Sequence, residues 1–585
     1  MRNALFLILI LLLPVSSRGY VWDLDSQAQP RRWKVTTPHA SIPATSFNRD
    51  NGAIRYYVGQ AGYSVTNTAA EINAVHASFA QWSSVPGTGV KFEFGGLLPG
   101  NPVIDYSDGT NAVFWARNST LVNNGEPSGG TLDISGSLGF AFPNVVDGTT
   151  ELAECDIVLN GVDFVWYTDR LTDRTGSSEY LIEGTMVHEI GHLLGLSHTP
   201  IGSASMYWTG QRDNLTQQAG LSSDEISVMQ GYYGDGTMAN VLGSVSGTVT
   251  MSGSAVYGAA VILSDANGAV VAAAMTDGMG NYQIDAVPAG NGSVRAVPLD
   301  PPSGVVLING PRISSDYQVA NTAFSPSASV AVTVVAMQDA QANLTVTPGR
   351  TGFHITHVLP NGGGGPRTAA TFVHPSESPI LIGVALPFGM TSQTVLDVLG
   401  TGVSVGATDL NTTTFPGYSF LTAMLTLDPN AVPGMRTLRL TEGIDSVYAN
   451  GFLEIIGDQE DFNFDGVDDA FQRTYFDLWT SAEAGPDADP DDDQFPNRSE
   501  SIAGTHPKNA QSRLQVDEVI RTMTETTVRW QAVSGKRYQL SYKDTLEDPM
   551  WQNVGVEVTA SSSVGEAIDA TAAGQARFYR VMVVE

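Results

Sequence analysis

Three histidines stand close together in the stretch TMVHEIGHLLGLSH. His188 and His192 are four residues apart, and His198 follows them after a glycine. Residues four apart on a helix project from the same face, so the first two imidazoles can bind one ion. Gly195 lets the chain reverse out of the helix, which allows His198 to return as a third nitrogen ligand. The spacing predicts a Zn²⁺ site with three histidine ligands.

Glu189 decides whether such a site is structural or catalytic. Structural zinc sites usually have four protein ligands, whereas three histidines leave a coordination position for a reacting water molecule. Glu189 directly follows the first ligand, where its carboxylate can take a proton from that water as a general base. A purely structural site has no use for this glutamate, so the sequence favours hydrolysis.

The stretch HEIGHLLGLSH resembles the extended zinc motif of the metzincin metalloendopeptidases. Met206 stands at the position where the matrixin subgroup carries its Met-turn. LSSDEISVMQGYYG resembles the terminal helix of matrixins, and LGFAFP resembles the edge strand that aligns their peptide substrate. The resemblance covers residues 50–234. It implies that Met206 forms an apolar floor beneath the metal and that Tyr207 lies near the wall of the primary specificity pocket.

Two features depart from the matrixin pattern. Matrixins hold a second, structural zinc partly through histidines on the edge strand and the following strand, but Phe140 and Val158 occupy those positions. Matrixins are also commonly kept latent by a propeptide cysteine. Here the single cysteine, Cys155, falls in a predicted strand of the catalytic domain, and residues 20–50 are too short to fold as such a propeptide. We therefore expect one zinc ion and no cysteine switch.

Three helices are expected to frame the site. The apolar residues from Thr68 onward recur at helical spacing, and Glu71 completes a predicted capping box with Thr68. A second helix is expected to begin near Ser178 and to carry the histidines. A third begins at Ser222, which forms another predicted capping box with Glu225. Alternating segments such as IRYYV and AVFW add strands, so the predicted class is α+β.

The N-terminus has the anatomy of a secretory signal peptide. Residues 1–19 contain a basic Arg2, an apolar run and a small-residue stretch, with cleavage expected before Tyr20. The apolar run is about half of the roughly 20 residues that span a bilayer. No later segment is both long and uniformly apolar, so we expect a secreted protein without a membrane span.

The length of 585 residues predicts several domains. After the third helix, turn signals recur about every ten residues, as in β-sandwiches. The segment TDGMGNYQI resembles the carboxypeptidase regulatory-like fold. The expected multidomain order is an α+β metzincin catalytic domain (20–236), a carboxypeptidase regulatory-like β-sandwich (240–347), an immunoglobulin-like β-sandwich (350–457), an acidic calcium-binding spacer (458–512) and a C-terminal β-domain (513–585).

Two stretches of the acidic spacer have the ligand spacing of EF-hand-like loops. The second has the acid Glu500 at its last position, where the first has Gln472, but it places Gln494 where a glycine usually turns. The pair resembles the calcium-binding type 3 repeats of secreted proteins, and a solvated acidic linker is the alternative. The predicted Ca²⁺ ligands are Asp461, Asn463, Asp465, the Val467 carbonyl, Asp469 and Gln472 in the first loop, and Asp489, Asp491, Asp493, the Phe495 carbonyl, Asn497 and Glu500 in the second.

The overall charge argues against some classes of binding partner. With 60 acidic and 29 basic residues, the formal net charge is −31, which repels nucleic acids and anionic membranes. The leading hypothesis is a secreted zinc-dependent metalloendopeptidase acting on proteins or peptides, with β-domains that bind substrate, a surface or a matrix. The alternative is a calcium-dependent adhesion or matrix-binding protein whose metzincin domain is not catalytic. The sequence leaves the natural substrate and the oligomeric state open.

Overall fold

The computed structural model divides the chain into two compact units, Met1–Asp458 and Gln459–Glu585. The predicted signal peptide, residues 1–19, lies outside the described residues, and so does its expected cleavage point. No helix in the described part of the chain is long and apolar enough to span a membrane. The structure describes residues 23, 29–100, 102–118, 120–123, 130–170, 179–208, 218–299, 323–349, 354–360, 368–387, 389–412, 417–572 and 576–584.

The N-terminal part of unit 1 is built on a mixed sheet. Strands β2, β4 and β8 run parallel, while β7 pairs antiparallel with β8 and forms one end of the sheet order. The edge position of β7 agrees with the prediction made from LGFAFP. The strands of the sheet are β1 (Phe47–Asn48), β2 (Ala53–Gly59), β3 (Phe92–Leu98), β4 (Ala112–Ala116), β7 (Gly139–Val145) and β8 (Leu152–Asn160). Two short pairs flank them, β5 (Leu121–Asn123) with β6 (Thr131–Asp133) and β9 (Val165–Tyr167) with β10 (Glu179–Leu181).

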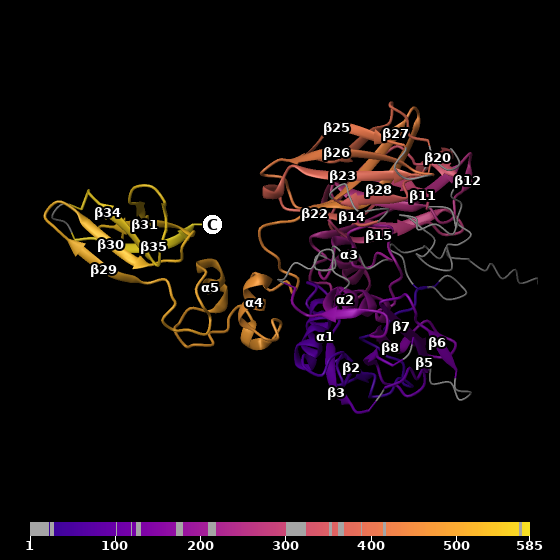
Figure 1. Cartoon of the computed structure of the whole chain (residues 1–585), viewed down its shortest axis with the longest axis horizontal. Coiled ribbons are helices and arrows are strands. Elements are labelled where there is room, and N and C mark those ends of the chain that lie inside the picture. Colours follow the sequence, from indigo (N-terminus) through magenta and orange to yellow (C-terminus); the bar gives the residue numbers. More distant parts are fainter. Residues whose placement is uncertain are drawn as a thin grey trace, which may run out of the picture. The chain divides into compact units, whose positions relative to one another are not determined.

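Two helices pack beside this sheet (Figure 1). Helix α1 (Thr68–Ser83) contacts β3, and α2 (Ile182–Leu193) contacts α1, β7 and β8. The predicted start of the second helix near Ser178 is wrong, because residues 179–181 pair with β9 as strand β10 instead. Between the helices, Trp82 donates its indole N–H to the carbonyl of Val187 over 3.0 Å. Helix α2 is therefore fixed from its side as well as by the sheet.

The two predicted capping boxes have different outcomes. Helix α3 (Ser223–Tyr232) begins after Ser222, and Ser222 and Glu225 form the predicted reciprocal bonds. The box at Thr68 is wrong, because helix α1 has no side-chain cap. The carboxylate of Glu71 accepts hydrogen bonds from the backbone N–H and the hydroxyl of Ser64 instead. The Glu71 carboxylate thus binds Ser64 of the preceding loop instead of a backbone N–H group at the N-terminus of helix α1.

The first β-domain, Leu242–Pro348, has two sheets around a shared apolar core. One sheet has the order β12-β11-β20-β17, with β15 and β19 also on β11, and the other has the order β14-β13-β16-β18. The strands are β11 (Leu242–Met251), β12 (Ser254–Ala255), β13 (Ala260–Asp265), β14 (Val270–Met275), β15 (Asn281–Pro288), β16 (Gly290–Val297), β17 (Phe324–Ser325), β18 (Val330–Val334), β19 (Asp339–Gln341) and β20 (Leu344–Pro348).

The second β-domain, His357–Ile455, repeats this two-sheet arrangement around its own core. The sheet orders are β21-β23-β26-β25 and β22-β28-β27-β24. The strands are β21 (His357–Pro360), β22 (Thr371–Val373), β23 (Ile380–Leu386), β24 (Val395–Leu399), β25 (Val403–Asn411), β26 (Ser419–Leu427), β27 (Gly434–Glu442) and β28 (Asp445–Ile455), with a short 3-10 helix at Pro375–Glu377.

Unit 2 combines the acidic loops with a C-terminal β-domain. Each acidic loop leads into a short helix, α4 (Asp469–Tyr475) or α5 (Asn497–Ala503), and a 3-10 helix (Ala482–Ala484) stands between them. The sheets that follow have the orders β29-β30-β34 and β32-β31-β33, with β35 on β31. Their strands are β29 (Val516–Arg521), β30 (Thr526–Gln531), β31 (Arg537–Lys543), β32 (Gln552–Asn553), β33 (Val558–Thr559), β34 (Val564–Asp569) and β35 (Phe578–Val584).

Asp224 joins the zinc-motif region to the first β-domain. Its carboxyl group accepts a hydrogen bond from the Thr199 hydroxyl at 2.7 Å and another from the backbone N–H of Ala273, in β14, at 2.8 Å. The side chain is fully buried. Burial, together with the neighbouring Glu225, raises the pKa of Asp224 well above its usual range. Burial therefore disfavours the charged form of this carboxyl group, while the two hydrogen bonds favour it.

We predict that Asp224→Ala lowers the free energy of unfolding of unit 1 by about 2 kcal/mol or more, because two buried groups lose their partner. Asp224→Asn is expected to cost clearly less, since its amide oxygen can still accept from the N–H of Ala273 and its NH2 group can donate to the rotatable Thr199 hydroxyl. Urea unfolding of the full chain, followed by tryptophan fluorescence, measures both. Equal losses for the two variants would contradict this role of Asp224.

Candidate active site

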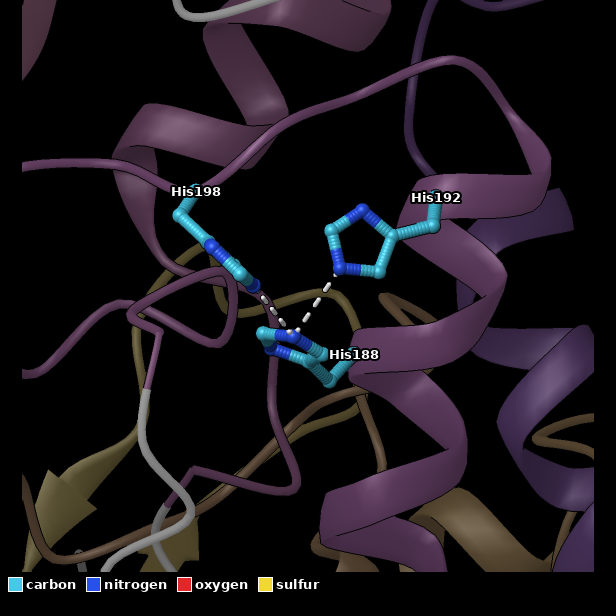
Figure 2. A group of neighbouring side chains, drawn as sticks. All are labelled: His188, His192 and His198. Atoms are coloured by element: carbon cyan, nitrogen blue, oxygen red, sulfur yellow. Dashed lines mark hydrogen bonds between the residues drawn. The ribbon is translucent and has the colours of Figure 1, made fainter. Parts of the chain in front are cut away.

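The three predicted zinc ligands meet in one cluster. Their ring nitrogens lie within 4.8 Å of one another, and Nε2 of His188 is 3.1 Å from Nε2 of His192 and 3.2 Å from Nε2 of His198. Figure 2 shows the three rings turned toward one another, two from helix α2 and one from the loop after it. Tetrahedral zinc with Zn–N bonds of about 2.0–2.1 Å separates its nitrogens by about 3.3 Å.

Backbone carbonyls orient two of the rings. Nδ1 of His188 lies 2.7 Å from the carbonyl oxygen of Ser205, and Nδ1 of His192 lies 2.7 Å from that of Leu196. A carbonyl only accepts, so each Nδ1 carries the proton and each Nε2 presents a lone pair. Burial, with the other two histidines nearby, also lowers the pKa of His188 well below its usual range, and burial lowers that of His192. Neutral imidazole rings whose Nε2 lone pairs point at one another can bind a cation between them.

The turn after helix α2 depends on Gly195. Its φ is +93°, in the left-handed region, as predicted for the residue that reverses the chain. A Cβ at this position would also lie 2.0 Å from the carbonyl oxygen of Arg31. Glycine is therefore required here by conformation and by space.

Two residues that the sequence analysis did not single out close the end of helix α2. Trp33 donates its indole N–H to the carbonyl of Leu193 at 2.9 Å, and the Tyr233 hydroxyl donates to the carbonyl of Leu194 at 2.9 Å. The Tyr233 oxygen also accepts from the backbone N–H of Trp33. They satisfy carbonyls that a helix end leaves without partners. Trp33 lies far before helix α2 in the sequence, and Tyr233 follows helix α3. No local sequence pattern around helix α2 therefore predicts these two contacts.

Met206 packs against helix α2. A Cβ on Gly191 would lie 2.2 Å from the Met206 sulfur, so the side chain packs on the helix between the two histidines. The backbone N–H of Met206 donates to the Glu225 carboxylate at 2.9 Å, and its carbonyl accepts from the N–H of Thr199 at 3.0 Å. The Met-turn is thereby tied to helix α3 and to the segment that carries His198.

Glu189 lies in the same cleft as the three histidines. This cleft has a volume of about 630 Å³, and strand β7 lines one side of it. The Glu189 side chain is buried, which raises its pKa to about 8, whereas a hydrogen bond from the backbone N–H of Ala141 acts in the opposite direction. A bound cation lowers such a pKa and favours the carboxylate. A Cβ on Gly139 would lie 2.8 Å from a Glu189 oxygen, so strand and carboxylate approach closely.

The cleft is lined by residues from several elements. Tyr207, predicted near the specificity pocket, is among them but is only 1% exposed. The lining residues that surround the histidines and Glu189 include Gly139, Phe140, Ala141, Pro143, Tyr180, Ser205, Tyr207 and Trp208.

Phe140 and Val158, which stand where the resemblance would place histidines for a second zinc, form part of an apolar cluster. Phe140 and Val158 stand opposite each other on β7 and β8, and both belong to the same group of packed hydrophobic side chains. Cys155, on β8, is fully buried, and burial raises the pKa of its thiol. The side chains of Phe140 and Val158 have no atom that can bind a metal ion.

Comparison with known protein families finds a match for the N-terminal part of the chain. Residues 47–234 match the family model for matrixin. This range holds the histidine cluster, Glu189 and Met206, and it supports a matrixin-type, zinc metallopeptidase-type domain. In a comparison with curated proteins, none matches the sequence.

Among solved structures, the Bacillus anthracis TIE protein is similar at 10% sequence identity, over 59% of this chain and 45% of that chain, with a TM-score of 0.13. The alignment thus spans less than half of that chain. At this TM-score the likeness carries no structural argument for the present protein.

The two acidic loops have matching backbones. Gly466 and Gln494, at the same loop position, both adopt left-handed conformations, with φ of +78° and +77°. Asp461 accepts from the backbone N–H of Gly466 at 3.0 Å, and Asp489 accepts from that of Gln494 at 2.9 Å. Gln494 therefore makes the turn that the sequence analysis expected of a glycine.

The loops differ in how their ligand side chains are satisfied. In the first loop, the amide of Gln472 donates to Asp465 at 2.8 Å. The loop therefore supplies one of its carboxylates with a hydrogen-bond donor of its own. In the second, the carboxylates of Asp489, Asp491 and Asp493 lie within 4.8 Å of one another. Asn497 donates its amide to the carbonyls of Glu483 and Gly485, which turns its oxygen the other way. The second loop therefore gathers several oxygen atoms, and backbone N–H groups satisfy only part of them.

We predict that Gly195→Ala reduces the zinc content of the purified chain and lowers its melting temperature, because the turn that presents His198 cannot accept a Cβ. Gly236→Ala is the matched control, since Gly236 also has a left-handed φ, +85°, but a Cβ there would meet no atom within 4 Å. The control is expected to lose about 1 kcal/mol of stability and to keep its zinc. Metal analysis and thermal melts measure both, and equal zinc loss would contradict the steric argument.

Proposed function

We propose that this protein is a secreted zinc-dependent metalloendopeptidase that hydrolyses peptide bonds in proteins. The observation that carries the proposal is the convergence of three imidazole nitrogens beside Glu189 in one cleft. The matrixin match over residues 47–234 supports it. Export is inferred from the signal-peptide pattern of residues 1–19.

His188, His192 and His198 would hold the zinc through Nε2. When bound, Zn²⁺ supplies Lewis-acid polarisation of the scissile carbonyl and of the attacking water. Glu189 takes a proton from this water on a carboxylate oxygen and passes it to the leaving amine nitrogen. The N–H of Ala141 holds the carboxylate in place. Met206 supports the helix from which two ligands project.

Strand β7 offers a way to align the substrate. It ends the sheet order and lines the cleft, so its outer backbone edge can pair with an extended peptide as an added strand. Such pairing recognises backbone rather than side chains, which suits an enzyme acting on protein substrates.

We expect Glu189→Gln to retain zinc and to lower the rate of casein cleavage at least 100-fold, because general-base catalysis contributes about 10² to 10⁴. His188→Ala is the companion variant and should lose both zinc and activity. Cleavage is followed by gel electrophoresis and zinc by metal analysis on the same samples. A glutamine variant as active as the parent would disprove the assigned base. A parent chain that binds zinc but cleaves nothing would favour the adhesion alternative.

A second function, Ca²⁺ binding by unit 2, is proposed for the second acidic loop. Four buried oxygen atoms have no hydrogen-bond partner: Oδ2 of Asp491, Oδ2 of Asp493, Oδ1 of Asn497 and Oε2 of Glu500. These atoms belong to the predicted ligand positions 3, 5, 9 and 12 of an EF-hand-like loop. Burial, with the nearby aspartates, raises the pKa of Glu500 to about 7. A divalent cation would satisfy these oxygens and neutralise the carboxylates.

The first loop is proposed as a weaker Ca²⁺ site with the same backbone. It supplies Asp461, Asn463, Asp465, the Val467 carbonyl and Asp469, but its last position is the amide of Gln472. A neutral amide replaces the bidentate acid that usually completes such loops. Two sites of unequal affinity are therefore expected.

Calcium is expected to raise the melting temperature of unit 2 in the full chain, with a stabilisation that approaches about 2.7 kcal/mol at 100 times the dissociation constant. Glu500→Gln should weaken the tighter site seen by isothermal titration calorimetry. Glu547→Gln, an exposed residue of the same unit, is the matched control and should titrate as the parent does. If chelator leaves every thermal transition unchanged and no heat of binding appears, the acidic stretch is a solvated linker.

A further inference from the structure

The segment after the third histidine is shared between the cleft and the second β-domain. Residues 201–208 follow His198 and contain Met206 and Tyr207. Ser205 and Tyr207 line the cleft. Tyr207 also belongs to the apolar core of the second β-domain, where it packs with residues from that domain's sheets. One aromatic side chain therefore serves two parts of the fold.

Strand β28 bulges toward this segment. Residues 450–452 stand opposite the single residue Thr437 of β27, so they leave the regular ladder. Their middle residue, Gly451, has a left-handed φ of +67°. A Cβ there would lie 2.4 Å from the side chain of Ile201. Bulges redirect side chains and free backbone groups from the ladder, and this one faces the chain that leaves the zinc site.

The freed carbonyls of the bulge bind that chain directly. The carbonyl of Asn450 accepts from the N–H of Gly202 at 2.8 Å, and the carbonyl of Gly451 accepts from the N–H of Ser203 at 2.9 Å. These are backbone bonds, so they fix where the segment lies whatever its side chains are. The first β-domain adds a contact to the bulge, since the Arg295 guanidinium donates to the Asn450 side chain at 3.2 Å.

Phe452 completes the contact. Its side chain is fully buried, and its ring meets the Tyr207 ring edge to face, with centroids 5.4 Å apart and an interplanar angle of 86°. A Cβ on Gly202 would lie 2.5 Å from the Phe452 ring. The ring thus fills the space behind Tyr207 and rests on Gly202. Aromatic pairs of this geometry hold both rings in place.

We propose that Phe452, a residue of the second β-domain, is a positioning residue that sets the substrate preference of the cleft. It holds Tyr207 in the cleft wall from behind, while the bulge fixes the backbone of residues 201–203. The inference rests on the proposed peptidase function. Phe452 touches no reacting group and acts through Tyr207.

The test compares Phe452→Ala and Phe452→Leu with Phe420→Ala in the full-length chain. Phe420 is a buried phenylalanine of the same β-domain, in a separate apolar cluster with Leu359 and Ala385, so its loss controls for general destabilisation. Each variant is incubated with a peptide library, and cleavage products are identified by mass spectrometry. Zinc content and melting temperature are recorded on the same preparations.

For Phe452→Ala we expect the preference at one substrate position to change at least fivefold and KM to rise more than kcat falls, with zinc retained. Phe452→Leu should give a smaller change of the same kind, and it carries the test if the alanine variant does not fold. Phe420→Ala should keep the parent's preference. If the Phe452 variants cleave with the parent's preference, the proposal is wrong.

Hydrogen exchange separates this inference from the proposed activity. Phe452→Ala should raise exchange of the amides of residues 201–208 at least tenfold, relative to Phe420→Ala, whether or not the chain cleaves peptides. A parent chain without activity but with this exchange pattern would refute the peptidase function and retain the positioning contact. Unchanged exchange in both variants would refute the contact itself.

Discussion

The cluster of three histidines depends on two hydrogen bonds from imidazole to backbone carbonyl. Each places a proton on Nδ1, so that His188 and His192 direct lone pairs at a common point. The accepting carbonyls belong to Leu196 and Ser205, which lie in the chain after the helix. The chemistry of the site is therefore set by the course of the loop as much as by the helix that carries the ligands.

The loop in turn is held from several sides. The turn after helix α2 requires Gly195, and the Met-turn is tied to Glu225 and Thr199 by bonds of its own backbone. The carboxylate of Glu225 serves two ends at once, since it also completes the cap of helix α3. The start of helix α3 and the peptide group between Ser205 and Met206 thus share the Glu225 side chain. Because the Ser205 carbonyl of that peptide group orients His188, local helix stability is coupled to the orientation of this imidazole.

Features that involve residues a few positions apart could be predicted from the sequence. The histidine spacing, the turn and the cap formed by Ser222 and Glu225 are of this kind, because periodicity and capping are local rules. Glu71 was assigned wrongly because Ser64, from the loop before the helix, offers its carboxylate better donors. The indole bond of Trp82 and the bulge at Gly451 join distant segments. No spacing in the chain records such contacts, so only the structure reveals them.

The bulge of strand β28 also bears on how such a protein can diverge. The matrixin-type region ends well before the second β-domain in the sequence, yet Phe452, from a strand of that domain, packs against Tyr207 in the wall of the cleft. Exchange of the second β-domain for an unrelated one would remove the ring behind Tyr207 together with the domain. Selection acting on that strand can therefore change the side chains packed behind the cleft wall without altering any of the three histidines.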